Sequence, residues 1–276
     1  MEEKVLVLRC CRQDRTSCMD FRWPASGPVE CSDWDSRPEC GNGLHGWLWG
    51  NGSSRVSNID VNNPNTLWLV VEVLKFDIVD LGDKVKFPRG NVVYCGDRET
   101  AVKMILDKAP QGTAVMFQNM TCGPEATIRC GDYSNVISGF KSIIFAGNNV
   151  NIIAKSHCQI NAGSVSTITA GYGSTVVAES FSIINTEKRC SITVGDNSSI
   201  IAGEYSTVKA GNNSNLTIAW WCSTTDRYGF MSAVFKSGLS HEQLMADTRY
   251  KVVVEAGEPK FVEIIDTQID TKKFTP

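Results

Sequence analysis

Two consecutive stretches, Thr121-Cys-Gly-Pro-Glu-Ala-Thr-Ile128 and Arg129-Cys-Gly-Asp-Tyr-Ser-Asn-Val136, show the pattern that decides the fold. Each is a unit of eight residues, and thirteen such units follow one another from Thr113 to Leu216 without insertion or deletion. The eighth place of each unit is apolar, the second is small in nearly all units, and the sixth is serine in eight. A fixed period held over 104 residues is the sequence signature of a solenoid.

The eight-residue unit also predicts which side chains point inward. Places six, eight and two of the next unit alternate along the chain, as the inward face of a strand does. Two units close one coil, so the inward rows stack serine on serine and isoleucine on valine. The third place is glycine in nine units, and we expect it to supply the positive φ of a tight corner. The pattern predicts a mainly β protein with a short parallel β-solenoid of about six coils, sixteen residues per coil.

The units Thr169-Ala-Gly-Tyr-Gly-Ser-Thr-Val176 and Ile201-Ala-Gly-Glu-Tyr-Ser-Thr-Val208 resemble the A-G-Y-G-S-T-x-T octapeptide of bacterial ice-nucleation proteins. The resemblance implies flat outward threonine rows, formed here by place seven and by place one of the next unit. Those rows are broken in this chain, where Thr167 and Thr169 alone keep the full pair. The resemblance therefore implies the solenoid fold, while the broken rows and the few coils argue against ice nucleation.

Three segments before the repeats are similar to motifs of a family of uncharacterised bacterial and phage proteins. They are Phe21-Arg-Trp-Pro, Glu39-Cys-Gly-Asn-Gly-Leu-His-Gly and Lys84-Val-Lys-Phe-Pro-Arg-Gly. In that family a domain of unknown function precedes Ala-Gly-rich octads of variable number. The resemblance implies an architecture, and it implies no established activity.

The organisation predicted from these patterns has three parts. Residues 1–112 form an N-terminal α+β capping domain, 113–216 the octapeptide-repeat β-solenoid, and 217–276 a C-terminal β-rich cap and tail. Solenoid ends need caps, because an uncovered last coil exposes an open strand edge. In the first part we expect strands over Lys4–Arg9, Trp68–Leu74 and Asn91–Cys95, and a helix over Arg98–Lys108 capped by Asp97. In the last part we expect strands over Arg227–Phe235, Tyr250–Glu255 and Phe261–Ile265, and a helix beginning at Ser240.

Composition excludes several classes of function. The net charge of −3 demands neither a nucleic-acid partner nor an anionic membrane, so no direct DNA binding is expected. No segment approaches the roughly 18 apolar residues of a membrane span, and the first residues do not form a secretory signal. Eleven cysteines without a secretory signal favour a reducing, cytoplasmic location. No Cys-x2–4-Cys knuckle is present, so no metal site and no cofactor are expected.

A group of residues in the N-terminal domain has the composition of a nucleotide pocket. Glycines beside His45 allow close approach of a ligand, aromatic rings can stack on a base, and basic side chains can hold phosphate. The alternative is that the glycines form a turn and that the tryptophans and His45 pack in the core. The candidate ligand-binding residues are His45, Trp47, Trp49, Lys84, Lys86 and Arg89.

The solenoid register places an excess of apolar side chains on its outside. Exposed apolar rows usually mark an interface, and pairing two copies along one face would bury them. The candidate interface residues are Ile137, Ile143, Phe145, Ile153 and Ile201.

Together these features favour a non-catalytic scaffold that forms a homodimer or binds a protein partner. The resemblance to phage proteins implies one form of that function, in which the protein inhibits a host defence protein by binding it. A nucleotide-binding protein or enzyme with its site around His45 is the alternative, and no catalytic residue is assigned.

Overall fold

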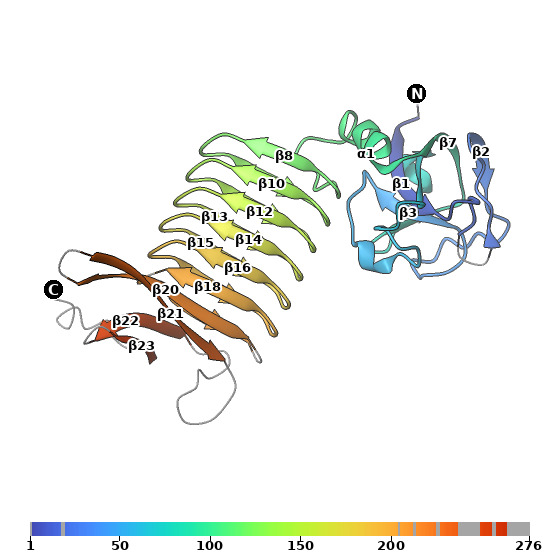
Figure 1. Cartoon of the computed structure of the whole chain (residues 1–276). Helices are drawn as coiled ribbons and strands as arrows, with labels where there is room; N and C mark the ends of the chain where they lie inside the picture. The colour runs from blue at the N-terminus through green and yellow to red at the C-terminus, as the bar shows by residue number, and fades with distance from the viewer. Residues whose placement is uncertain are drawn as a thin grey trace. The chain divides into compact units, whose positions relative to one another are not determined.

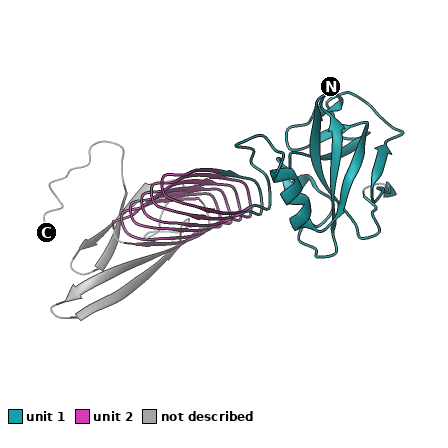
Figure 2. Cartoon of the chain, turned by 90° about the horizontal axis from the view of Figure 1, so that it is seen from above, with its two compact units in different colours: residues 1–118, 129–134 teal, residues 119–128, 135–276 magenta. Residues whose placement is uncertain are grey.

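The computed structural model describes residues 2–17, 20–203, 205–211, 214–224, 227–236, 249–255 and 258–263, with side chains up to Leu216. The chain divides into two compact units (Figure 2). One unit holds residues 1–118 and 129–134, and the other holds residues 119–128 and 135–276. No helix within the described ranges is long and apolar enough to cross a membrane.

The first unit is built on a seven-stranded antiparallel sheet with strand order β2-β7-β4-β1-β3-β6-β5 (Figure 1). One helix, α1 (Arg98–Leu106), follows the last strand, and Asp97 caps it by accepting a hydrogen bond from Thr100 N at 2.8 Å. The expected α+β domain is confirmed. The strands are β1 (Lys4–Cys11), β2 (Gly27–Glu30), β3 (Leu44–Leu48), β4 (Leu67–Leu74), β5 (Val79–Asp80), β6 (Val85–Phe87) and β7 (Arg89–Gly96).

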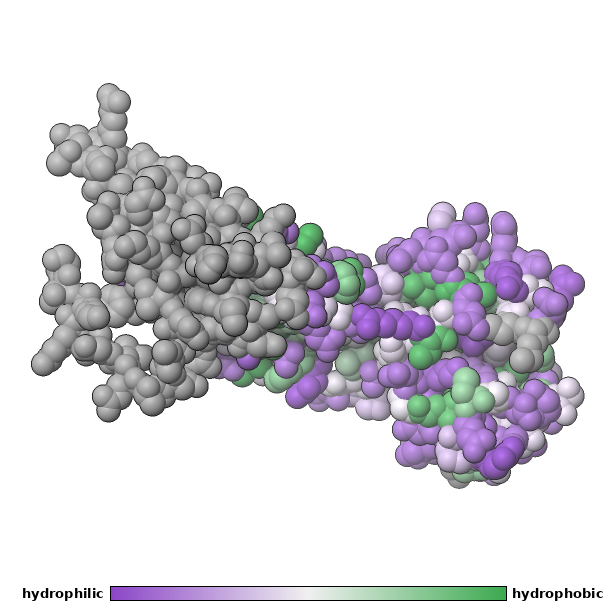
Figure 3. All heavy atoms as spheres, turned by 90° about the horizontal axis from the view of Figure 1, so that it is seen from below, coloured by the Kyte–Doolittle hydropathy of each residue, from purple (hydrophilic) through white to green (hydrophobic). Residues whose placement is uncertain are grey.

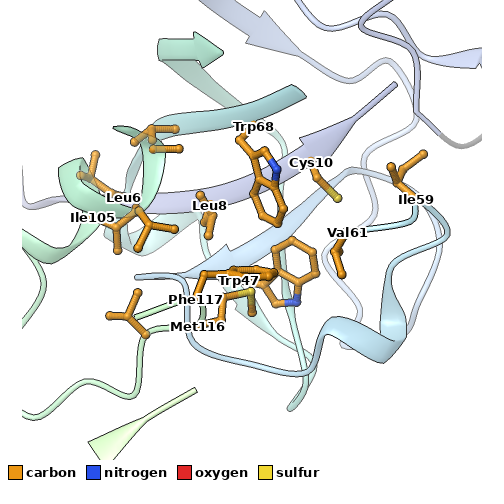
Figure 4. Packing of buried hydrophobic residues seen from close by; sticks show 14 residues of the cluster. Leu6, Leu8, Cys10, Trp47, Ile59, Val61, Trp68, Ile105, Met116 and Phe117 are labelled. Carbon is orange, nitrogen blue, oxygen red and sulfur yellow. The ribbon is translucent and has the colours of Figure 1, made fainter. Parts of the chain in front are cut away.

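Hydrophobic side chains pack on both faces of this sheet, and β1 contributes alternate residues to the two clusters. Leu8 packs with Trp68 and the inner side of α1 in one cluster (Figure 4). Val7 packs with Phe87 in the other. The ring of Trp47 stacks on Trp68 with centroids 6.3 Å apart, so Trp47 belongs to the first cluster. The sheet is therefore a rigid two-sided core that holds its loops in place.

The second unit is a parallel β-solenoid whose short strands alternate between two sheets (Figure 1). Neighbouring strands in each sheet are sixteen residues apart, as in the pairing of Ile152 with Ile168. The predicted coil of two octads is confirmed. The strands are β8 (Asn119–Cys122), β9 (Thr127–Cys130), β10 (Asn135–Ser138), β11 (Ile143–Ala146), β12 (Asn151–Ala154), β13 (Gln159–Ala162), β14 (Thr167–Ala170), β15 (Thr175–Ala178), β16 (Ile183–Thr186), β17 (Ser191–Val194), β18 (Ser199–Gly203) and β19 (Thr207–Ala210).

Burial along each strand follows the predicted register. In β12, Ile152 and Ala154 are buried, whereas Asn151 and Ile153 are exposed. The same order of exposed and buried residues recurs in β10, β13, β14, β15, β16 and β17. Places eight and two therefore fill the interior, and places seven and one face outward.

Serine at the sixth place forms a hydrogen-bonded ladder inside the solenoid. Ser198 Oγ accepts a hydrogen bond from Ser182 N at 3.2 Å and donates one to Gly195 O at 3.0 Å. Where cysteine replaces serine, the thiol takes over the donor role, and Cys190 Sγ donates to Gly171 O at 3.4 Å. Burial raises the pKa of the Cys190 thiol, which keeps it in the protonated form that can donate.

The expected role of the third-place glycine is wrong. Residues with positive φ occupy the fifth place instead, as at Tyr133 (58°), Val165 (61°) and Gly173 (67°). The third-place glycine is required by space, because a Cβ on Gly171 would lie 2.7 Å from Ser156 N in the preceding coil. The corner is thus turned by the fifth residue, and the third residue lets successive coils stack closely.

From Asn215 onward the chain forms longer strands that extend both sheets. β20 (Asn215–Thr224) pairs with β18 in parallel and with β21 (Arg227–Lys236) in antiparallel register. β22 (Arg249–Glu255) pairs antiparallel with β19 and with β23 (Glu258–Glu263). β21 and β22 match the strands predicted over Arg227–Phe235 and Tyr250–Glu255. β23 begins three residues before the strand predicted over Phe261–Ile265, whose last two residues, like the helix expected at Ser240, lie outside the described residues.

Candidate functional site

His45 lies on β3, where it is paired with Lys86 of the neighbouring strand β6. The ring is partly buried, and its Nε2 atom is buried without a hydrogen-bond partner among the described residues. Burial, the Lys84 ammonium and the Arg9 guanidinium together lower the pKa of His45 to about 4. The imidazole is therefore neutral at pH 7, and its Nε2 can accept or donate one hydrogen bond.

Two basic side chains lie near His45: Lys86 on β6, and Lys84, which directly precedes that strand. Lys86 is 1% exposed, and its Nζ donates to Glu39 O at 2.9 Å and lies 5.7 Å from the centre of the Trp34 ring. Lys84 Nζ is 3.1 Å from Cys40 Sγ. The loop that contains Glu39 and Cys40 thus covers this part of β6. The structure brings His45, Lys84 and Lys86 together, as the nucleotide hypothesis requires.

The other three candidate ligand residues lie elsewhere. Trp47 is 3% exposed and its indole nitrogen donates to Ser53 O at 3.0 Å, so its ring fills the core. Trp49 is half-buried and packs against both hydrophobic clusters. Arg89 is exposed and pairs with Asp77 at 3.4 Å. The two tryptophan rings therefore occupy the interior or its margin, where they pack against apolar side chains.

A cleft of about 500 Å³ lies on the first unit between β2, β4 and β7. Val29, Val73 and Gly90 are among its lining residues, and the ion pair of Arg89 with Asp77 stands at its side. This cleft could not be predicted from the sequence, because its lining residues come from four separated segments that only the sheet brings together. Among the residues that the structure describes, no group of three or more His, Cys, Asp and Glu is arranged to hold a metal ion.

The solenoid presents a flat face formed by the outward side chains of β8, β10, β12, β14, β16 and β18 and by Asn215 at the start of β20. We name it the uncharged face, because none of these described side chains carries a charge and all are exposed. Its outward residues are Asn119, Thr121, Asn135, Ile137, Asn151, Ile153, Thr167, Thr169, Ile183, Asn185, Ser199, Ile201 and Asn215.

The uncharged face carries four exposed isoleucines. Ile137 and Ile153 are direct neighbours on β10 and β12, and they are 50% and 48% exposed. Ile183 and Ile201 lie on β16 and β18 and are 55% and 41% exposed. The sequence-based interface set omits Ile183, although the repeat register places it outward. Hydrophobic residues lie exposed among hydrophilic ones on the described surface in the space-filling view (Figure 3).

The two remaining candidate interface residues, Ile143 and Phe145, lie on β11 in the other sheet. That sheet carries the cation Lys209 on β19, so its outer face is not free of charge. Most charged side chains of the repeats lie at the corners, with Lys141 and Arg189 at one corner and Glu179 at the opposite one. The repeat therefore keeps charge away from one flat face.

These features define a class of protein: an octapeptide-repeat β-solenoid preceded by a domain with an antiparallel sheet and one helix. Residues 5–104 match the family model described as "Domain of unknown function (DUF7666)". The repeats are homologous to those of ice nucleation proteins. The architecture that the two resemblances implied is confirmed.

Three relatives illustrate the similarity. An ice nucleation protein of Pseudomonas fluorescens is 40% identical over 114 residues, which are 41% of this chain and 9% of that protein. One from Pseudomonas syringae pv. syringae is 36% identical over 126 residues, 45% of this chain and 10% of that protein. One from Xanthomonas campestris pv. translucens is 34% identical over 110 residues, which are 39% of this chain and 7% of that protein.

The chain thus spans about a tenth of the length of the curated relatives that it matches. No solved structure matches this chain. A β-solenoid with repeats of this kind fits a non-catalytic scaffold.

Proposed function

We propose that this protein is a non-catalytic β-solenoid scaffold that self-associates through its uncharged face. The observation that carries the proposal is the composition of this face. Thirteen outward positions from Asn119 to Asn215 carry no charged side chain, in a chain of which 21% is charged. Four of the thirteen are isoleucines.

Water contact with those isoleucines carries a free-energy cost that association removes. Burying apolar surface contributes roughly 25 cal/mol per Å², and the side chains involved are about half exposed in the single chain. The asparagine and threonine side chains between them carry no charge, so bringing two such faces together does not strip water from ions. A flat surface with small and β-branched side chains also packs with little loss of rotamer freedom.

The proposal is tested by sedimentation velocity over a range of protein concentrations. We expect a dimer whose fraction rises with concentration, and we expect Ile137→Asp to make the protein monomeric, because a carboxylate would be buried opposite an apolar face. Val177→Asp is the matched control, since Val177 is 41% exposed on β15 of the other sheet. A wild-type protein that stays monomeric at all concentrations would overturn the proposal.

Inhibition of a host defence protein is the finer form of this proposal that the phage resemblance suggests. The same uncharged face would then bind the host protein. A purified candidate host protein that binds wild type and Val177→Asp equally, and binds Ile137→Asp at least tenfold more weakly, supports this form. Equal binding by all three proteins contradicts it.

Nucleotide binding in the first unit is the second candidate, and the cluster of His45, Lys84 and Lys86 favours it. The neutral imidazole of His45 and the ammonium group of Lys84 could hold one phosphate group, whereas Lys86 is buried and donates to Glu39 O. Native mass spectrometry of the protein as purified from cells tests this candidate. A retained mass of nucleotide size that Lys84→Gln removes supports it, and the bare mass of the chain after purification, with no binding of added ADP, contradicts it.

A further inference from the structure

The isoleucines of the uncharged face are arranged symmetrically about its central strand. The strands follow one another in the order β10, β12, β14, β16, β18. β14 presents Thr167 and Thr169, whereas each of the two strands on either side presents one isoleucine. The neighbours are Ile153 on β12 and Ile183 on β16. The outer strands β10 and β18 present Ile137 and Ile201.

If the two rods are aligned, two identical faces can meet about a two-fold axis in two ways. An axis along the rod keeps the two solenoids parallel and places each place-seven residue of one copy over a place-one residue of the other. An axis along the strands makes the solenoids antiparallel and keeps each place opposite itself. The two arrangements bring different side chains together, so the sequence of the face distinguishes them.

The parallel arrangement sets each isoleucine against a polar residue. Each strand would lie over the same strand of the second copy, with its two outward residues exchanged. Ile137 would face Asn135, Ile153 would face Asn151, and Ile201 would face Ser199. This arrangement buries apolar groups against amides and a hydroxyl that lose their water.

The antiparallel arrangement with its axis at β14 sets the isoleucines of the two outer strands against each other. Ile137 of one copy lies over Ile201 of the other, and this contact occurs twice because of the symmetry. Thr167 and Thr169 meet their own copies at the axis. At the end of the face, Asn119 lies over Asn215, and two primary amides can each donate and accept a hydrogen bond.

On β12 and β16, the two strands next to the axis, the isoleucines occupy different places of the octad. Ile153 occupies place one on β12, and Ile183 occupies place seven on β16. In the antiparallel arrangement these two strands lie over each other, so the two isoleucines are diagonal neighbours across the interface. Asn151 and Asn185 fill the other diagonal. Ile153 thus lies directly over Asn185, and Ile183 over Asn151, so the inner strands match no better here than in the parallel arrangement. The contact of Ile137 with Ile201 is what distinguishes the two arrangements.

We propose that the partner of the uncharged face is a second copy of this chain, packed antiparallel about a two-fold axis at β14. This inference rests on the proposed self-association and adds its symmetry, register and facing pairs. Seven strands at 4.8 Å and four residues at 3.3 Å give a footprint of roughly 400 Å² per copy. A standard interface buries about 800 Å² per partner, so we expect a weak dimer that dissociates on dilution.

Variants with one added cysteine and a short bismaleimide linker test the register. The background carries Cys31→Ser, Cys40→Ser, Cys95→Ser and Cys122→Ser, because these cysteines are exposed or partly exposed, and the background without an added cysteine is the reference. We expect Thr169→Cys to cross-link with its own copy at the axis. We expect Ile137→Cys and Ile201→Cys to cross-link only when the two variants are mixed. Two copies of Ile137→Cys would lie four strands apart, roughly 19 Å at 4.8 Å per strand, beyond a short linker.

The alternative outcomes separate this inference from the proposal on which it rests. Self-cross-linking by Ile137→Cys alone, by Ile201→Cys alone and by Thr169→Cys would show the parallel arrangement and overturn the inference while self-association stands. A concentration-dependent dimer in which none of these variants cross-links also overturns it. A monomer at all concentrations in sedimentation overturns both. Thr175→Cys on the other sheet is the control that should not cross-link.

Discussion

Asp132 Oδ2 accepts two hydrogen bonds from Ser54, one from the backbone nitrogen at 3.0 Å and one from Oγ at 2.7 Å. The two residues are 78 positions apart. Asp132 occupies the fourth place of an octad, and Ser54 begins a short 3-10 helix that follows β3. Both side chains are buried, at 3% and 6% exposure. The first unit therefore includes a corner of the repeat and holds it by a specific polar contact.

Asp132→Ala removes the acceptor for both hydrogen bonds. We expect it to lower the free energy of unfolding of the first unit by roughly 1–3 kcal/mol, because Ser54 N–H is left buried without a partner. Urea unfolding followed by tryptophan fluorescence measures this, since Trp47 and Trp68 lie in the same unit. Ser54→Ala keeps the backbone contact and should cost less. Equal stability of Asp132→Ala and wild type would falsify the anchoring role.

Gly171→Ala should destabilise the solenoid by roughly 1–3 kcal/mol, because the added Cβ would lie 2.7 Å from Ser156 N in the preceding coil. Gly123→Ala is a matched control, since Gly123 occupies the same place of an octad and a Cβ there meets nothing within 4 Å. Circular dichroism during thermal unfolding compares the two variants. Equal melting temperatures would show that close stacking does not require the glycine.

Val165→Asn should stabilise the solenoid by roughly 1 kcal/mol, because Val165 is a β-branched residue at a φ of 61° and asparagine tolerates this conformation better. Val165 is 48% exposed, so the change removes little packing. Asn149→Val is the reciprocal variant at the same place of an octad, and it should lower stability by a similar amount. Thermal unfolding measures both, and a loss of stability in Val165→Asn contradicts the assignment of strain.

The pKa of His45 makes stability depend on pH. Because burial and two cations hold this pKa near 4, below the usual 6.5, the folded protein binds fewer protons than the unfolded chain between these values. Stability therefore falls as the pH is lowered through this window. His45→Gln removes this loss, so between pH 7.5 and pH 5 its melting temperature should fall less than that of wild type. Parallel curves for the two proteins would contradict the buried, neutral imidazole.

The solenoid could be predicted because each octad has the alternation of inward and outward residues that is typical of a strand. The alternation of places six, eight and two identified the inward face, and the structure confirms it from β10 to β19. The role of the third-place glycine was wrong for a physical reason. A glycine permits positive φ and it also permits close approach, and the sequence does not distinguish these two uses.

The candidate ligand site was less predictable than the repeat. His45, Lys84 and Lys86 come together because β3 and β6 are paired, whereas Trp47 turns into the core and Arg89 pairs with Asp77. All six residues have side chains suited to a ligand, and nothing in their spacing states which face of a strand each occupies. In a sheet with cores on both faces, periodicity loses that information.

The period, the sixteen-residue coil and the outward rows could all be predicted from the sequence, because every coil repeats the same local contacts with its neighbours. Tertiary structure alone decided that a corner of the repeat is anchored to Ser54, and that β1 is the centre of a two-sided sheet. It also showed how exposed the four isoleucines of the uncharged face are. Contacts between distant segments depend on how whole elements pack, and no local pattern encodes them.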